Sequence, residues 1–153
     1  MTGGAVADSS ALIVFHQIGR LELLQAVLGR LAVPPAVARD VAPSLGVLPA
    51  WVELRRAPPN PDLPTYLDDG ERDAIALALH LGASTIVLDE LPGRRVAMAL
   101  RLDVVGSLGL LVRAKRAGLI RDVRPIMDAM LSWGLFASDS LYRQILAAAG
   151  ELN

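Results

Sequence analysis

Short apolar runs that alternate with helical segments are the feature that most limits the folds open to this chain. The runs are bounded by turn or helix-start residues, as the buried strands of a sheet are. They occupy residues 4–7, 31–33, 85–88 and 104–105. Apolar residues at helical spacing fill the intervals, over residues 11–17, 21–28, 35–41, 70–81 and 91–100. This alternation predicts an α/β fold with a mainly parallel central sheet.

The remaining segments predict a helical C-terminal part. Residues 43–64 are rich in proline and contain WVELRRA, which fits either a further strand or an irregular excursion. Helical spacing then covers residues 108–117, 123–133 and 139–149. The 153 residues contain no internal repeat or long linker and are an ordinary size for one domain. We therefore expect a single domain over residues 1–153, with a helical extension from about residue 120 to 153.

The composition excludes several classes of function. With 53% hydrophobic residues, 20% charged residues and a formal net charge of -1, the chain lacks the basic excess of a typical DNA-binding protein. It has no cysteine and only two histidines, so disulfides and thiolate metal sites are excluded and a histidine-rich zinc site is not expected. The start MTGGAVADSS has no basic leader, and the apolar runs are far shorter than the ~20 residues of a membrane span. We expect a cytoplasmic protein with no membrane contact.

Helical geometry sorts the acids of the stretch DDGERDAIALALHLGASTIVLDE, which begins at Asp68. Residues three or four apart share a helix face, so Glu71 lies with Ile75 and Ala78, whereas Asp73 turns away. An ionised carboxylate on an apolar face needs an amide, a base or a cation as partner. Glu71 could therefore face a metal. It could equally complete a capping box in which Asp68 is the N-cap residue.

Three further acids can reach the same region. Asp40 lies among apolar residues of the helix from Pro35, although it could also pair with Arg39 at the surface. Asp8 and Asp89 each follow a predicted strand, and in an open parallel sheet ligands bind outside the carboxyl ends of the strands. Both could instead cap the helices that follow them. Four converging carboxylates would repel one another unless cations neutralise them, and an oxygen-only ligand set favours Mg²⁺ or Mn²⁺.

These segments resemble the PIN-domain family of nucleases, which includes VapC-like toxins, and especially its compact bacterial and archaeal branch. The resemblance lies in ADSSALIVFHQIGRLELL, LAVPPAVARDV, DDGERDAIALALHLGASTIVLDE and GRRVAMALRLDVVGSLGLLVRAKRAGLI, which span Ala7 to Ile120 in the family's order. It implies a three-layer α/β/α fold with a mainly parallel sheet. Carried over by position, the family's four acids fall on Asp8, Asp40, Glu71 and Asp89.

The spacing around Gly82 supports two of these assignments, because the family places its third acid eleven residues before this glycine and its fourth acid seven residues after it. Two departures are present. Asp40 stands where the family often has glutamate, so it has a shorter reach. Val87 stands where the family often has threonine, so Glu90 could share or take the role of Asp89.

The resemblance implies a metal-dependent endoribonuclease that hydrolyses RNA phosphodiester bonds, with one or two Mg²⁺ or Mn²⁺ ions. Asp8, Glu71 and Asp89 would bind metal, Asp40 would support them, and Ser9 and Ser107 could assist. Ser107 could equally cap the helix that follows it. If the resemblance extends that far, a small antitoxin protein would restrain the enzyme. The helical C-terminal third could support a homodimer or receive such a partner, although core packing explains its apolar faces equally well.

Positive side chains should surround an acidic site that cuts RNA. The candidates are Arg20, Arg94, Arg95, Arg113, Lys115 and Arg116. Each could also be ordinary solvated helix surface. The small basic content predicts weak, strongly salt-dependent RNA affinity. Trp51 and Trp133 are expected to pack or to face a partner, because neither lies in a basic and aromatic cluster.

Other classes of protein share parts of this pattern. A PIN-like module that binds RNA or protein without cutting it would keep the fold and lose an acid. A phosphoaspartate receiver would need a lysine after a late strand, but Lys115 lies within a helix, and the DxD motif of a phosphatase is missing where ADSS stands. A nucleotide-binding oxidoreductase is disfavoured because no GxGxxG follows the first strand.

Overall fold

Five parallel strands form one sheet in the computed structural model, which describes residues 4–152. The ends of the predicted domain, residues 1–3 and 153, lie outside the described residues. The strands are β1 (Ala5–Ala7), β2 (Leu31–Val33), β3 (Val52–Leu54), β4 (Thr85–Val87) and β5 (Val104–Val105). Their order is β3-β2-β1-β4-β5, and every neighbouring pair is parallel. The predicted α/β class with a parallel sheet is confirmed.

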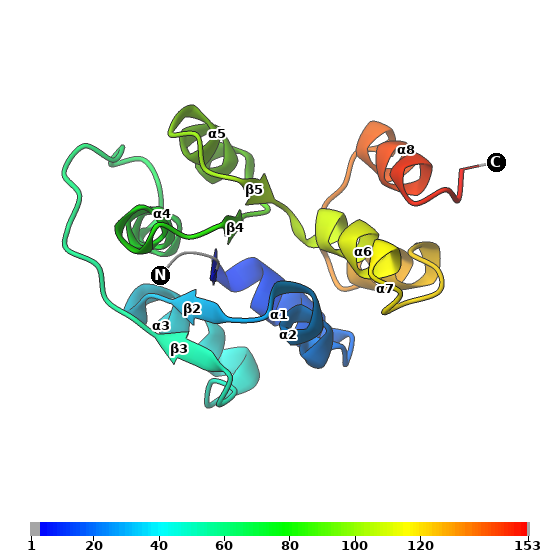
Figure 1. The fold of residues 1–153 in the computed structure, drawn as a ribbon, viewed down its shortest axis with the longest axis horizontal. Coiled ribbons are helices and arrows are strands. Elements are labelled where there is room, and N and C mark those ends of the chain that lie inside the picture. The colour runs from blue at the N-terminus through cyan, green and yellow to red at the C-terminus, as the bar shows by residue number, and fades with distance from the viewer. Residues whose placement is uncertain (1–3, 153) are drawn as a thin grey trace.

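Helices cover both faces of this sheet (Figure 1). They are α1 (Ser9–Gln17), α2 (Leu21–Leu28), α3 (Pro35–Leu45), α4 (Asp69–Leu81), α5 (Leu91–Ala99), α6 (Ser107–Arg116), α7 (Arg124–Ser132) and α8 (Asp139–Ala148). Helices α4 and α5 lie on one face, and α1, α2 and α3 lie on the other (Figure 1). The arrangement is the expected three-layer α/β/α fold.

The two faces bury separate apolar clusters because successive strand residues point to opposite sides. Ala5 and Ala7 of β1 join a cluster that includes Phe15 of α1, whereas Val6 packs on the other face with Ile75 of α4. Strands β1, β2 and β4 are buried on both sides, which explains why they appear in the sequence as continuous apolar runs. This packing holds the carboxyl ends of the strands at one edge.

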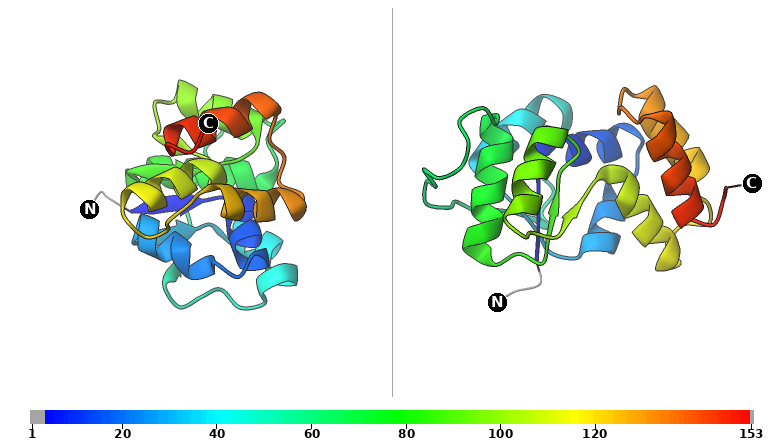
Figure 2. Two further views of the ribbon diagram at one scale, coloured as in Figure 1. Left: turned by 90° about the vertical axis from the view of Figure 1, so that its right-hand side faces the viewer. Right: turned by 90° about the horizontal axis from the view of Figure 1, so that it is seen from above.

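The helical C-terminal part packs against α1 and α2, on the face of the sheet that these helices cover, and its buried residues join their apolar cluster (Figure 2). Glu151 fastens it: its carboxylate accepts hydrogen bonds from the backbone N–H groups of Val123 and Arg124 at 2.6 and 3.0 Å, and from Lys115 Nζ at 3.0 Å. The start of α7, the end of α6 and the segment after α8 therefore meet at one side chain. Within residues 4–152, no helix is long and apolar enough to cross a membrane.

The helix and strand bounds differ from expectation at three points. The undecided proline-rich segment contains β3, an edge strand whose Val52 is buried and whose following residue Arg55 donates its N–H to Val33 O at 3.0 Å. Helix α3 continues past its expected end through Pro43, because its last turns are exposed and tolerate one missing hydrogen bond. Helix α1 starts at Ser9, directly after Asp8.

Candidate metal centre

Asp8 and Asp89, the first and fourth predicted acids, follow β1 and β4, the two neighbouring strands from which the sheet extends in opposite directions. From β1 the chain builds β2 and β3 to one side, whereas β4 and β5 lie on the other side. The ends of β1 and β4 therefore flank a topological switch point, where open α/β sheets bind ligands. Asp8 follows β1 and is only 6% exposed. Its carboxylate makes no capping hydrogen bond to α1, so the capping alternative does not account for it.

Glu71 reaches this edge from the first turn of α4. The Oδ1 atom of Asp68 accepts a hydrogen bond from the Glu71 backbone N–H at 2.7 Å, so Asp68 is the N-cap residue, as the capping alternative requires. Glu71 itself is only 4% exposed. A methyl group added to Gly93 of α5 would lie 2.5 Å from Glu71 Oε2, so a glycine leaves room for this carboxylate.

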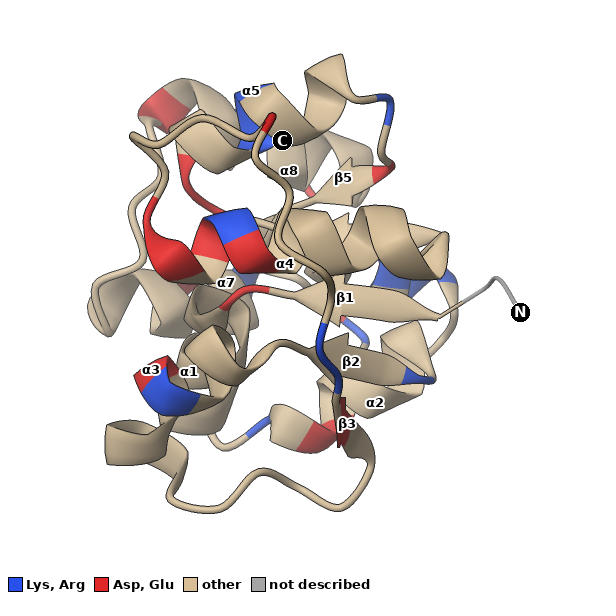
Figure 3. Cartoon of the chain, turned by 90° about the vertical axis from the view of Figure 1, so that its left-hand side faces the viewer, with Lys and Arg blue, Asp and Glu red and all other residues tan. Residues whose placement is uncertain are grey.

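Three carboxylates surround Gly70 at the same edge. A methyl group on Gly70 would lie 2.8 Å from Asp40 Oδ2, 3.0 Å from Asp8 Oδ1 and 3.5 Å from Asp68 Oδ1. Asp40 is exposed at the rim, and the structure brings its side chain to the other acids. Figure 3 shows acidic segments gathered at the start of α4 and the end of β1. Asp8 and Asp40 thus lie together beside Gly70, and Asp8 is near enough to Glu71 for its charge to raise the pKa of that carboxyl.

A second grouping joins Glu71 to two residues, Asp68 and Glu90, that the sequence analysis did not assign as principal ligands. One carboxylate oxygen from each of Asp68, Glu71 and Glu90 lies within 4.8 Å of the others. In addition, Asp8 Oδ1 and Glu71 Oε2 are buried and accept no hydrogen bond from the residues that the structure describes. Buried carboxylate oxygens without donors need a cation or a proton. An all-oxygen donor set with such unsatisfied atoms fits Mg²⁺ or Mn²⁺.

The electrostatics of the cluster agree with this fit. Burial raises the pKa of Asp8 from 3.8 to about 6, and the negative charges of Asp68, Asp40 and Glu90 add to this effect. Burial also raises the pKa of Glu71 from 4.5 to about 7, again with help from neighbouring carboxylates. The backbone N–H groups of Ser9 and Asp68 offset these increases only in part. A bound divalent cation would reverse both effects, because it stabilises the ionised carboxylates.

Asp89 has a different environment from the other three acids. Its Oδ1 atom accepts the Ser107 backbone N–H at 2.7 Å, and its Oδ2 atom accepts the hydroxyls of Ser107 at 2.6 Å and Ser10 at 2.9 Å. Ser107 does not cap α6 with its side chain; Gly106 occupies the N-cap position. Ser9, a predicted helper, lines the groove next to Asp89. Ser10 was missed, although it lies two residues after Asp8 at the same helix start.

The predicted RNA-binding residues of α6 lie away from the acids. Helix α6 begins at the site with Ser107 and runs toward the opposite edge of the sheet. There Arg113 pairs with Asp103 at 3.5 Å, and Lys115 pairs with Glu151. Arg116 donates to the backbone oxygen of Ala148 at 3.4 Å. These contacts hold parts of the fold together.

The two arginines of α5 are nearer to the acids. Arg94 Nη1 donates to Leu88 O at 2.8 Å, at the end of β4, and the side chain lines the groove beside Asp89. Arg95 is exposed on the same helix. Arg20 is exposed at the start of α2. Arg94 is therefore the predicted basic residue that the structure places in contact with the groove.

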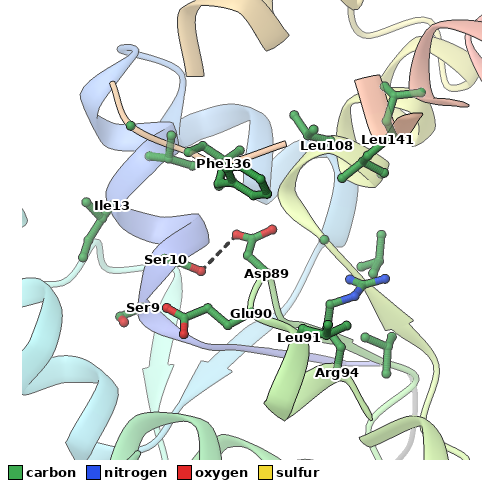
Figure 4. A pocket seen from close by; sticks show the side chains of 18 of the residues that line it. Ser9, Ser10, Ile13, Asp89, Glu90, Leu91, Arg94, Leu108, Phe136 and Leu141 are labelled. Atoms are coloured by element: carbon green, nitrogen blue, oxygen red, sulfur yellow. Dashed lines mark hydrogen bonds between the residues drawn. The ribbon is translucent and has the colours of Figure 1, made fainter. Parts of the chain in front are cut away.

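A groove with a volume of about 1110 Å³ runs from Asp89 and Glu90 to the C-terminal helices. Ser9, Asp89 and Glu90 line its acidic end, and apolar side chains of α1, α6 and the α7–α8 connection line the rest. Phe136 is 84% exposed and lines the same groove as Asp89 (Figure 4). Trp133, 56% exposed, also lines the groove, whereas Trp51 packs against the core.

Comparison with known proteins agrees with this architecture. A family model described as a PIN domain matches residues 4–151. The chain belongs to the PIN-domain family. A PilT N-terminus domain protein from the hyperthermophilic archaeon Sulfolobus solfataricus P2 has a similar structure, with a TM-score of 0.51 and 16% sequence identity over 90% of this chain and 98% of that one. A search of curated proteins found no match. The PIN domain is a nuclease-type fold, and the acidic cluster is compatible with metal binding.

Proposed function

We propose that this PIN-domain protein is a metal-dependent endoribonuclease that hydrolyses RNA phosphodiester bonds with Mg²⁺ or Mn²⁺. The observation that carries the proposal is the pair of buried, unsatisfied oxygens, Asp8 Oδ1 and Glu71 Oε2, within an acidic cluster at the switch point of the sheet. A structural salt bridge would have supplied each oxygen with a donor. A nuclease site requires such oxygens to remain available to a cation.

The residues of the chain have separable roles in this mechanism. Asp8 and Glu71 would hold the cation, because their side chains are buried and fixed by β1 and α4. When bound, the cation would lower the pKa of a water molecule and stabilise the charge that develops on the phosphate. Asp40 Oδ2, at the exposed rim, would accept a hydrogen bond from the attacking water and hold it toward the phosphorus.

The groove beside the acids supports the proposal of a regulated toxin. An RNA strand that reached the cation would pass Arg94 and the exposed Phe136. A small antitoxin, or a second copy of the chain, that filled the apolar part would cover the same acidic end. We propose that the protein is a toxin restrained in this way, and that it acts in the cytoplasm. Its induced expression in bacteria should arrest growth, whereas expression of Asp8→Asn should not.

A catalytically silent RNA- or protein-binding module is the alternative function. The specific observation in its favour is Asp89, the fourth acid of the family, whose two oxygens accept three hydrogen bonds from Ser10 and Ser107. If a free fourth carboxylate is required for cutting, this chain would bind RNA without hydrolysing it.

Incubation of the purified protein with structured and unstructured RNA distinguishes the two functions. The nuclease should cut in Mg²⁺ or Mn²⁺ and stop in EDTA, and Asp8→Asn and Glu71→Gln should each lower the rate by at least about 100-fold, the scale of one electrostatic catalytic group. His80→Gln, an exposed change on the far part of α4, is the matched control. Cleavage that is unchanged in both acid variants would refute the site, and RNA binding without cleavage would establish the silent module.

A further inference from the structure

The two adjacent acids after β4 have different environments, and this difference indicates different roles. We propose, building on the proposed nuclease function, that Glu90 binds the metal ion together with Asp68 and Glu71. Asp89 is then a positioning residue that fixes the β4–α5 connection through Ser10 and Ser107. The assignment moves the ligand by one residue from the position that the family pattern selects.

Three neighbouring carboxylates can each offer an oxygen to a cation at this site. Asp68, Glu71 and Glu90 each offer a carboxylate oxygen within 4.8 Å of the other two. A divalent ion at about 2.1 Å from each ligand brings oxygens to such separations after only small side-chain movements. Glu71 Oε2 is buried and has no hydrogen-bond donor among the described residues. It lies against Gly93 in the first turn of α5, the helix whose N-cap residue is Glu90.

The backbone leaves the other two carboxylates available as well. Glu90 occupies the N-cap position of α5 but makes no side-chain capping hydrogen bond, so its carboxylate is not committed to the helix. Asp68 caps α4 through Oδ1. Its Oδ2 atom is not used in that bond. Each of the three residues can thus give one oxygen to a cation without losing a hydrogen bond of the fold.

The carboxylate of Asp89, in contrast, already has hydrogen-bond donors for both of its oxygens. Three donors at 2.6–2.9 Å, two of them from Ser107, engage both of its oxygens. These bonds join the end of β4 to the starts of α1 and α6. Figure 4 shows the bond between Ser10 and Asp89. A methyl group on Gly106 would lie 3.0 Å from Asp89 Oδ1, so the chain also crowds this carboxylate from a third side. Direct ligation would require Asp89 to give up these contacts.

Mn²⁺ titration of the full chain, followed by calorimetry after EDTA treatment and dialysis, tests the assignment without RNA. Glu90→Gln and Asp68→Asn should each weaken Mn²⁺ binding by about tenfold or more, because affinity follows the number of charged ligands. Asparagine caps a helix as well as aspartate does, so Asp68→Asn keeps the start of α4. Glu22→Gln, an exposed change on α2, is the control and should leave the affinity unchanged.

Thermal unfolding in EDTA provides the second readout. Glu90→Gln should keep or raise the melting temperature, because it removes a negative charge that repels Asp8 and Glu71. Asp89→Asn and Ser107→Ala should lower it, because they break the joint between β4 and α6, and they should weaken Mn²⁺ binding less than Glu90→Gln does. If Asp89→Asn fails to fold, Ser107→Ala supplies this comparison.

The opposite pattern overturns the inference. If Glu90→Gln binds Mn²⁺ as the parent does, Glu90 is not a ligand. If Asp89→Asn folds with an unchanged melting temperature and loses Mn²⁺ binding as fully as Glu71→Gln, Asp89 is the ligand after all. Either result leaves the proposed nuclease standing, since metal-dependent RNA cleavage is measured separately.

Discussion

Asparagine in place of Asp8 should stabilise the metal-free protein above pH 6, although it removes a residue that the cation needs. Asp8 is almost fully buried, and its Oδ1 atom has no hydrogen-bond donor among the described residues. Its pKa rises from 3.8 to about 6, chiefly through burial. Each pKa unit corresponds to about 1.4 kcal/mol, so ionised Asp8 destabilises the folded state by roughly 3 kcal/mol.

Proton linkage determines whether the stability of the protein rises or falls with pH. The folded protein holds a proton on Asp8 more tightly than the unfolded chain does, so stability falls as the pH rises from 3.8 to about 6 and is level above that. Asparagine is neutral throughout. The free energy of unfolding of the variant should therefore exceed that of the parent by up to about 3 kcal/mol at pH 8 and should equal it below pH 3.8. At pH 8 this difference corresponds to roughly 6–12 °C in melting temperature for a domain of this size.

Urea unfolding in EDTA from pH 4 to 8, followed by circular dichroism, measures this difference, with Glu22→Gln as the control. Saturating Mn²⁺ should reverse the order of stability, because the cation stabilises the parent through Asp8 and binds the variant more weakly. A variant that is no more stable than the parent at pH 8 in EDTA would refute the account of Asp8 as a buried, uncompensated charge.

Three further substitutions test the metal centre, the C-terminal helices and the groove. Gly93→Ala should weaken Mn²⁺ binding in calorimetry while it leaves the helix content unchanged in circular dichroism, because the added methyl group would collide with Glu71 Oε2; unchanged binding would contradict the close approach. Glu151→Ala should lower the free energy of unfolding by about 1–3 kcal/mol in urea titrations, because the partly buried N–H of Val123 and the N–H of Arg124 lose their acceptor, while the RNA cleavage rate of the folded protein stays unchanged. Phe136→Ala should raise KM for unstructured RNA with little effect on kcat, which a steady-state comparison with Tyr66→Ala, an exposed aromatic outside the groove, can test.

Local pattern was sufficient to place three of the acids. Helical spacing put Glu71 on the buried face of α4, and the rule for strand ends put Asp8 at the switch point, since both depend only on the regular geometry of one element. Asp40 came from its position in α3, and its side chain does approach Asp8 near Gly70.

The state of Asp89 could not be obtained in that way. Its partners come from distant parts of the chain, Ser10 at a separation of 79 residues and Ser107 at 18. A strand-end rule gives the position of a carboxylate but not the donors that other elements bring to it. Glu90 was noted only as a possible substitute, because its freedom depends on what its neighbour binds.

The remaining differences have similar causes. Asp68 was interpreted as a helix cap, and its Oδ1 atom does cap α4. That interpretation did not predict that Asp68 also lies in the acidic group with Glu71 and Glu90. Lys115 was considered for RNA from its charge alone, but its partner Glu151 lies 36 residues later, where only the tertiary fold brings it. Charge along a helix does not reveal which side chains already have a partner.

Asp68 is both the N-cap residue of α4 and a member of the acidic cluster, and this combination affects motion at the start of the helix. The Asp68 side chain accepts a hydrogen bond from the backbone N–H of Glu71, and it also lies among carboxylates that repel one another. Without a cation, that repulsion favours opening of the first helical turn. With a cation, the cap and the ligand reinforce each other. Amide hydrogen exchange at Gly70 to Arg72 should therefore slow when Mn²⁺ is added, while exchange in the middle of the helix stays the same. The beginning of this helix would thus report whether the ion is bound.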